Sequence, residues 1–141
     1  MRLSGWGRFP IVEATACSPY SEERLRKCLF RGGTWISYAM GRSYGDSALN
    51  NQVLLMRHLN RIVDFDGQEG ILTCETGVTL AEIIDCFLPR GWFLSVTPGT
   101  KHISVGGAIA SDVHGKNHHF EGAFSSSVHS FDLMTGDGQI R

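Results

Sequence analysis

PGTKHISVGGAIASDVHGKNHH, residues Pro98–His119, is the stretch that decides the fold of this chain. It combines four glycines and other small residues with three histidines and a lysine near its end. A buried core segment does not need this composition. A backbone that lies against a phosphate-bearing ligand does, because only small residues let main-chain N–H groups approach phosphate oxygens. The stretch therefore predicts one half of a dinucleotide cradle.

Composition sets the broad class. The 141 residues suffice for one domain with a hydrophobic core, and 42% hydrophobic and 19% charged residues are typical of globular proteins. A formal net charge of -1 provides no overall positive field that would attract nucleic acid. The 17 glycines, roughly 12% against a usual value of about 7%, cluster in loops and so indicate tight backbone geometry.

The four cysteines, Cys17, Cys28, Cys74 and Cys86, form no CxxC pair, which disfavours a zinc knuckle or a redox dithiol. Each lies among apolar residues, so we expect reduced, half-buried thiols and a reducing compartment. The N-terminus shows no signal peptide, and no apolar run reaches the length of a membrane span. These features predict a cytoplasmic protein.

Sequence periodicity and turn residues predict alternating helices and strands after an extended arm over residues 1–10. Thr79 followed by Glu82 is a capping box, and Gly91 is suited to ending the same helix. Ser104 is placed to cap a second short helix that ends near Ala110. The remaining expected elements are a helix from Ser18-Pro19 to Phe30, strands at Trp35–Tyr38, Val53–Met56, Phe93–Val96 and Val128–Met134, and a hairpin of Ile62–Phe65 with Ile71–Glu75.

Gly136-Asp137-Gly138 is a further hairpin turn, and Arg141 lies only two or three residues beyond it. A hairpin cut at this point would leave a sheet edge unpaired. We therefore expect the 141 residues to be part of a longer protein.

A second glycine loop, Gly41-Arg42-Ser43-Tyr44-Gly45, matches the G-x-S-x-G pattern of a hydrolase nucleophile elbow. Asp112 and His114 follow Ser43 in the order of a catalytic triad, so a serine hydrolase is one alternative. Two features weaken it: the residues after Ser43 resemble a loop rather than a helix, and Asp112 and His114 are too close in sequence to come from separate strand ends.

Other site classes fit the histidine segment less well. His114, His118 and His119 suggest a metal site, but only Asp112 stands at ligand spacing from them, and we expect no metal. Gly115-Lys116-Asn117 lacks the residues of a Walker loop, and no G-x-G-x-x-G stands between a strand and a helix. What remains is a pair of glycine loops, each following a strand, whose N–H groups and hydroxyls at Ser43, Thr100 and Ser104 could hold a pyrophosphate.

These two loops carry a resemblance to a known family. Met40–Asn50 (MGRSYGDSALN) and Pro98–His119 resemble the FAD-linked oxidases of the vanillyl-alcohol oxidase/p-cresol methylhydroxylase type, as do Leu3–Arg8 and Asp132–Gly138. Within that family the chain is most similar to the oxidases of polyprenyl-phosphate ribose. The resemblance implies an α+β FAD-binding domain of the p-cresol methylhydroxylase (PCMH) type, of which residues 1–141 would supply the first α+β subdomain and the start of the second. A substrate domain, absent here, would follow.

The same resemblance assigns roles to residues. Gly41–Asp46 would be the first pyrophosphate loop, and Gly99-Thr100 with Ser104–Gly107 the second cradle. Asp112–His119 would run along the flavin side, with His114 and Lys116 facing the flavin or the substrate, while the catalytic base stays unassigned. The cofactor-binding set is Gly41, Arg42, Ser43, Tyr44, Gly45, Asp46, Gly99, Thr100, Ser104, Val105, Gly106, Gly107, Asp112, His114, Gly115, Asn117, His118 and His119.

The implied reaction is hydride transfer from a CH–OH group of a sugar to FAD, as in the first half of an epimerisation that supplies arabinose donors. Relatives that tether flavin covalently from the first loop carry a histidine where this chain has Arg42, so we expect non-covalent FAD. The expected partner is a small or lipid-linked sugar, and a lipid-linked one would require peripheral association with a membrane. A second alternative is a non-catalytic FAD-domain subunit that requires a partner chain supplying the missing domain.

Overall fold

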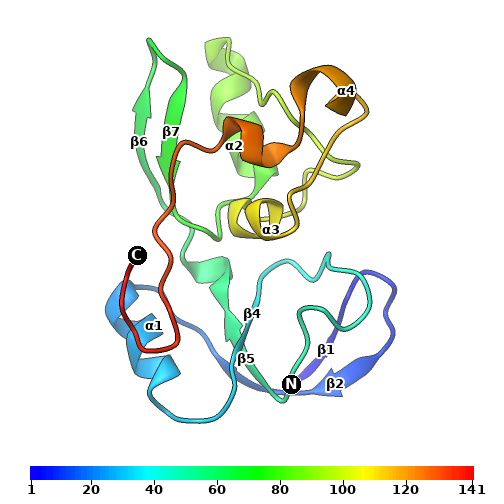
Figure 1. Cartoon of the computed structure of the whole chain (residues 1–141), viewed down its shortest axis with the longest axis vertical. Helices are drawn as coiled ribbons and strands as arrows, with labels where there is room; N and C mark the ends of the chain where they lie inside the picture. The colour runs from blue at the N-terminus through cyan, green and yellow to red at the C-terminus, as the bar shows by residue number, and fades with distance from the viewer. The chain divides into compact units, whose positions relative to one another are not determined.

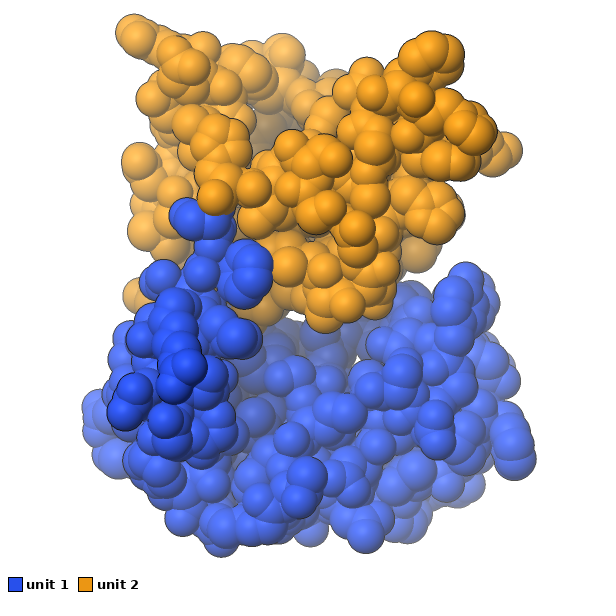
Figure 2. Space-filling view, in the orientation of Figure 1, with its two compact units in different colours: residues 1–59, 130–141 blue, residues 60–129 orange.

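The computed structural model describes all 141 residues and divides them into two compact units (Figures 1 and 2). Unit 1 comprises Met1–Leu59 and Ser130–Arg141, and unit 2 comprises Asn60–His129. Helices and strands are mixed in the chain, which confirms the expected α+β domain. None of the helices combines the length and apolar character that a membrane crossing demands.

Unit 1 is built on five short strands. β1 (Arg2–Ser4) pairs with β2 (Ile11–Glu13) antiparallel, while β3 (Thr15–Cys17), β5 (Gln52–Leu55) and β4 (Ile36–Tyr38) form a parallel sheet in that order. The central strand, β5, is almost fully buried and contributes Val53 and Leu55 to a core shared with Leu3 and Ala14. The residues predicted as an extended arm thus supply the β1–β2 pair.

Helix α1 (Glu22–Leu29) connects β3 to β4 and covers the sheet with Cys28 and Leu25. The helix begins three residues after the predicted Pro19 because the side chain of Ser21 accepts a hydrogen bond from the Arg24 N–H, at 3.3 Å. The short helical turn η1 (Met56–His58) follows β5 and completes this unit's first segment.

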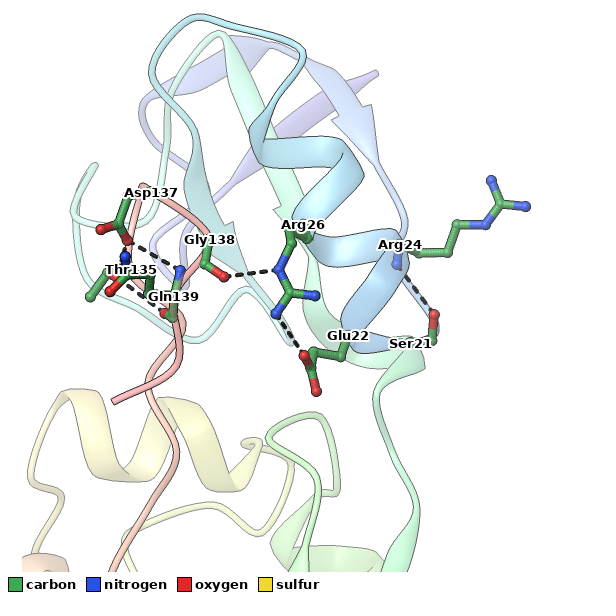
Figure 3. A network of polar contacts seen from close by, with 8 residues as sticks. All are labelled: Ser21, Glu22, Arg24, Arg26, Thr135, Asp137, Gly138 and Gln139. Carbon is green, nitrogen blue, oxygen red and sulfur yellow. Dashed lines mark hydrogen bonds and ion pairs between the residues drawn. The ribbon is translucent and has the colours of Figure 1, made fainter.

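The C-terminal segment of unit 1 folds back as a hairpin against α1 (Figure 3). Leu133 and Arg141 exchange backbone hydrogen bonds of 2.9 and 3.0 Å, and Gly138 adopts a left-handed conformation at the turn. Arg26 of α1 donates from Nε to the Gly138 carbonyl at 2.9 Å and from Nη2 to Glu22 at 2.7 Å. The predicted turn is confirmed, but the predicted strand Val128–Met134 is wrong, because only the bridge between Met134 and Ile140 forms.

Unit 2 begins with the predicted hairpin, β6 (Ile62–Asp66) and β7 (Ile71–Cys74), followed by α2 (Leu80–Phe87). The capping box is present as expected: Glu82 N–H donates to the Thr79 hydroxyl, and the Glu82 carboxylate accepts from the Thr79 N–H. Gly91 is left-handed, but it ends the additional turn η2 (Leu88–Arg90) rather than α2. Phe93–Val96 is not a strand, although Val96 is buried.

The rest of unit 2 consists of short helices on a common core. They are α3 (Val105–Ala110), α4 (His118–Glu121) and η3 (Phe124–Ser127). Ala108 of α3 and Phe124 of η3 pack with Val78, Leu80 and Phe87. The core therefore joins α2 directly to the glycine-rich stretch.

An ion pair ties the beginning of β6 to the end of β7. Arg61 donates to the Glu75 carboxylate from its backbone N–H, Nε and Nη2, at 2.7, 3.0 and 2.7 Å, and the Glu75 side chain is only 16% exposed. The hydrogen bonds from Arg61 hold the pKa of Glu75 below its ordinary value of 4.5. Glu75 directly precedes Thr76, the residue against which Gly106 of α3 packs.

We expect Glu75→Gln to reduce the free energy of unfolding at neutral pH. A carboxyl whose pKa is lower in the folded than in the unfolded chain stabilises fully above the unfolded pKa, and that contribution is lost as pH falls through the folded pKa. Urea unfolding from pH 7 to pH 3 should therefore show the two proteins converging in acid. Glu69→Gln, an exposed change in the same hairpin, is the matched control, and a difference between wild type and Glu75→Gln that is constant across this range would contradict the prediction.

Candidate cofactor site

The first predicted pyrophosphate loop lies in unit 1 and is shaped by two glycines. Gly41 and Gly45 have φ of +63° and +55°, in the left-handed region that glycine adopts without strain. A side chain at Gly41 would overlap the hydroxyl of Tyr38, whereas the space beside Gly45 is open. Left-handed residues of this kind turn successive N–H groups toward one side, the arrangement that binds anions.

The backbone donors of this loop are unused within the chain. The carbonyls of Ser43, Tyr44 and Asp46 accept hydrogen bonds from Trp6, Ser47 and Leu49, at 2.9, 3.5 and 2.8 Å. None of the N–H groups of residues 41–46 donates to another residue. The loop thus presents six consecutive N–H groups to a ligand or to water.

The second predicted cradle lies in unit 2, at the beginning of α3. Ser104 is buried and caps the helix, its hydroxyl accepting from the Gly107 N–H at 3.1 Å. Val105 N–H donates to the Val78 carbonyl at 2.7 Å, and Gly106 N–H donates to the Thr76 carbonyl at 2.9 Å. The first N–H groups of α3 are therefore occupied by the protein itself. This pairing fastens α3 to the segment Thr76–Val78.

Gly99 and Thr100 are arranged differently. The Thr100 hydroxyl accepts from the His102 N–H at 3.2 Å, and Lys101 accepts from Ala81 at 2.9 Å, so the turn is held at its C-terminal side. The N–H groups of Gly99 and Thr100 have no partner in the chain, and nothing lies within 4 Å of where a side chain at Gly99 would stand. In this cradle the free donors are therefore at Gly99-Thr100.

Asp112 ends α3. Its N–H donates to the Ile109 carbonyl and the N–H of Val113 to the Ala108 carbonyl, both at 3.1 Å, and its φ is +41°. This is a Schellman motif with aspartate in the position that glycine usually takes. The Asp112 carboxylate accepts from the Ser125 N–H at 2.9 Å, which ties the end of α3 to η3.

The histidine segment is held by backbone contacts that leave its basic side chains exposed. A side chain at the buried Gly115 would approach the Thr97 carbonyl to 2.7 Å, and Asn117 donates from Nδ2 to the Ser95 carbonyl at 2.9 Å. The His118 ring lies 5.4 Å from the His114 ring and 3.9 Å from the His119 ring. Lys116 is exposed and makes no hydrogen bond or ion pair. No cluster of three metal-binding side chains is present.

The structure thus brings Gly41–Asp46 together in unit 1, and Gly99–Gly107 and Asp112–His119 together in unit 2. The triad alternative finds no support in these positions: no helix follows Ser43, and the Asp112 carboxylate is occupied by Ser125. Two exposed residues of unit 1, Trp6 and Arg8, line a cavity beside Gly41 and were given no role by sequence reasoning. The signals for them were the glycines that flank Trp6 and the family resemblance of Leu3–Arg8.

The cysteines differ from expectation. Cys17 and Cys28 form a disulfide that joins β3 to α1, with Cα atoms 6.1 Å apart, whereas Cys74 and Cys86 are free. The prediction of four reduced thiols is therefore wrong for two of them, because residues 11 apart in sequence meet where α1 packs on the sheet. The argument from free thiols to a reducing compartment loses its support.

Comparison with known proteins identifies the family of this chain. The family described as FAD binding domain matches residues 22–141. A decaprenylphosphoryl-beta-D-ribose oxidase of Mycolicibacterium smegmatis is 39% identical over 99% of this chain, which spans 32% of that protein.

Solved structures share the fold. An alkyldihydroxyacetonephosphate synthase superposes with a TM-score of 0.73 at 20% identity, covering 86% of this chain and 25% of that one. A berberine bridge enzyme variant has a TM-score of 0.72 at 25% identity, covering 89% of this chain and 27% of that one. With its motifs, its fold and the match over residues 22–141 in agreement, the chain belongs to the FAD-binding domain family of PCMH-type flavoenzymes, and FAD is its cofactor.

Proposed function

We propose that this chain is the FAD-binding part of an oxidoreductase that oxidises a CH–OH group of a sugar-type substrate, with a polyprenyl-phosphate ribose as the substrate class. The observation that carries the proposal is the loop Gly41–Asp46, whose N–H groups are all unpartnered between two left-handed glycines. The substrate class rests on the similarity to the mycobacterial oxidase over 99% of the chain. When bound, FAD supplies the hydride acceptor.

Three groups of residues in the chain have different roles in holding this cofactor. Gly41–Asp46 and Gly99-Thr100 offer free N–H groups to the pyrophosphate. Ser104, Val105 and Gly106 keep α3 in place through contacts with Thr76 and Val78, and the backbone of Gly107 is exposed to solvent. Asp112, Gly115 and Asn117 fix the backbone that carries the histidines, while His118 and His119 border the flavin side.

His114 and Lys116 face the flavin or the substrate in this proposal. Both side chains are exposed, and the Lys116 ammonium has no acidic partner in the chain. It is therefore free to pair with an anionic group of a ligand, such as a sugar phosphate. The proposal assigns the catalytic base to neither residue.

Titration of the purified chain with FAD, followed by flavin fluorescence, tests the proposal. We expect saturable binding in the micromolar range or weaker and no oxidase turnover, because the chain spans about a third of its oxidase relative. Acid precipitation should release all yellow colour to the supernatant, since Arg42 offers no side chain that forms a flavin tether. FAD that failed to bind at millimolar concentration would overturn the proposal, and sub-micromolar binding with turnover would show that no further domain is needed.

The alternative of a non-catalytic FAD-domain subunit makes a different prediction from the same material. Such a subunit would gain FAD affinity and activity only when a partner chain is added. Copurification with a second polypeptide, followed by activity of the reconstituted pair, would favour it over the single-chain oxidoreductase.

A further inference from the structure

Unit 1 contains a cavity of about 550 Å³ that is lined by Gly41 and Arg42 of the first pyrophosphate loop and by residues to which the cofactor assignments above give no role. One wall comes from the end of β1 and the turn after it, and the other from the end of β4 and the first pyrophosphate loop. The lining residues are Ser4, Gly5, Trp6, Arg8, Tyr38, Met40, Gly41 and Arg42. Both walls therefore belong to the same compact unit.

The charge of this cavity is positive. Arg8 and Arg42 are the charged residues of its lining, and no carboxylate is among them. Neither guanidinium takes part in an ion pair, whereas the neighbouring Arg2 pairs with Glu13. Arg42 instead lies over the Trp6 ring, 5.2 Å from its centroid, a cation–π contact that orients the guanidinium without neutralising it. Two guanidinium groups without an acidic partner are suited to binding an anionic ligand.

The backbone at Arg8 is strained. Arg8 has φ of +58°, an unfavourable conformation for a residue with a side chain, and its N–H closes a turn onto the Gly5 carbonyl at 3.1 Å. The turn is fixed to the pyrophosphate loop, because Trp6 N–H donates to the Ser43 carbonyl at 2.9 Å. A side chain at Gly5 would stand 2.5 Å from that carbonyl oxygen. Glycine would be less strained than arginine at position 8. The presence of arginine there therefore indicates that its side chain has a function.

We propose that Arg8 and Arg42, the latter oriented by Trp6, bind the diphosphate of FAD in this cavity. The inference rests on the proposed function and adds the β1–β2 turn to the cofactor site. A diphosphate carries about two negative charges, which match the two guanidinium groups, and the planar fork of arginine fits phosphate oxygens. The free N–H groups of Gly41 and Arg42 lie in the same wall and supply further donors.

Arg8→Gly is the decisive variant. Glycine adopts φ of +58° without strain, so the fold should be as stable as the wild type or slightly more so. Loss of a charge-assisted hydrogen bond to a phosphate should weaken binding of FAD, and of ADP as a flavin-free diphosphate probe, by about 10-fold to 100-fold. Arg8→Lys, which keeps the charge, should lie in between.

Arg2→Gln is the matched control, because it removes one positive charge from the same strand pair outside the cavity. It should bind FAD and ADP within about twofold of the wild type. The salt dependence of FAD binding should be shallower for Arg8→Gly than for Arg2→Gln, since only Arg8 faces the ligand's charge. Arg8→Asn, which also tolerates a left-handed backbone, replaces Arg8→Gly if thermal unfolding shows the glycine variant to be misfolded.

The outcomes separate this inference from the proposed function. Wild-type FAD binding that persists unchanged in folded Arg8→Gly would overturn the inference and leave the proposed function standing. Unchanged binding of FAD and ADP together with lost binding of ribose 5-phosphate would place a substrate phosphate in the cavity and would also overturn it. A wild-type chain that binds neither FAD nor ADP would overturn both the inference and the proposed function.

Discussion

Gly106→Val is expected to lower the free energy of unfolding by about 3 kcal/mol, because the new side chain would overlap Thr76. A β-carbon at position 106 would collide with Thr76 Oγ1 and would stand 3.1 Å from Thr76 Cβ and 3.2 Å from the Thr76 carbonyl oxygen. The Gly106 N–H donates to that same carbonyl at 2.9 Å, so α3 cannot move away without losing the bond. Displacement of α3 would also disturb Ala108, which is fully buried in the core of unit 2.

The measurement is equilibrium unfolding in urea, with FAD titration of the same samples. Gly107→Ala is the matched control, since its β-carbon would meet only the Ser104 hydroxyl, at 3.2 Å. Alanine is favoured over glycine inside a helix by about 0.5–1 kcal/mol, which offsets the small shift that the Ser104 hydroxyl must make, so this variant should be close to the wild type in stability. It should nevertheless bind FAD more weakly if the cofactor approaches the exposed backbone at Gly107.

A smaller change probes the cause of the effect. Gly106→Ala should be destabilised less than Gly106→Val, and adding Thr76→Ala should restore part of the loss because the nearest atom is then removed. A Gly106→Val protein as stable as the wild type would show that α3 does not depend on its contact with Thr76.

Local capping signals predicted the helices well. Thr79 with Glu82, and Ser104 with Gly107, are arrangements within four residues, and the structure forms both as expected. Such signals depend only on neighbouring backbone N–H groups and so need no knowledge of the rest of the fold. The hairpin β6–β7 was found for the same reason, because its turn residues lie between two apolar runs.

Strands that need a distant partner were predicted less well. Phe93–Val96 has the apolar residues of a strand, yet it contributes Val96 to the core without pairing. Val128–Met134 alternates like a strand, but only its last residues find a partner. Alternation indicates that one side of a segment is buried, whereas pairing also needs a free neighbouring edge, which the sequence does not reveal.

In the candidate site, too, local features were predicted and contacts with distant residues were not. The glycine pattern located both loops, and the left-handed Gly41 and Gly45 agree with the tight backbone geometry that the glycines indicated. The occupied N–H groups of Val105 and Gly106 could not be foreseen, because their acceptors at Val78 and Thr76 lie nearly 30 residues upstream. The left-handed backbone of Arg8 has no sequence signal either, since arginine is not a residue that turns require.

Reduction of the Cys17–Cys28 disulfide is expected to lower the free energy of unfolding by about 3 kcal/mol, because the unfolded chain then loses the constraint of a closed loop. The two cysteines are 11 residues apart, and both are buried with Leu54 beneath α1. Reduced thiols pack much as the disulfide does, since cysteine behaves as a small hydrophobic residue. The folded state should therefore keep its shape while the unfolded state gains entropy.

Urea unfolding with and without dithiothreitol measures this difference. The wild type should lose about 3 kcal/mol on reduction. Cys74→Ala/Cys86→Ala, which removes the free thiols, should lose the same amount, and Cys17→Ala/Cys28→Ala should lose none. Thiol counting in denaturant supplies the chemical check, because burial and the nearby Glu75 carboxylate raise the pKa of the Cys74 thiol and slow its reaction in the folded protein. A wild-type chain purified without reductant that shows four reactive thiols in denaturant, and a stability indifferent to dithiothreitol, would mean that α1 is held to the sheet by packing alone.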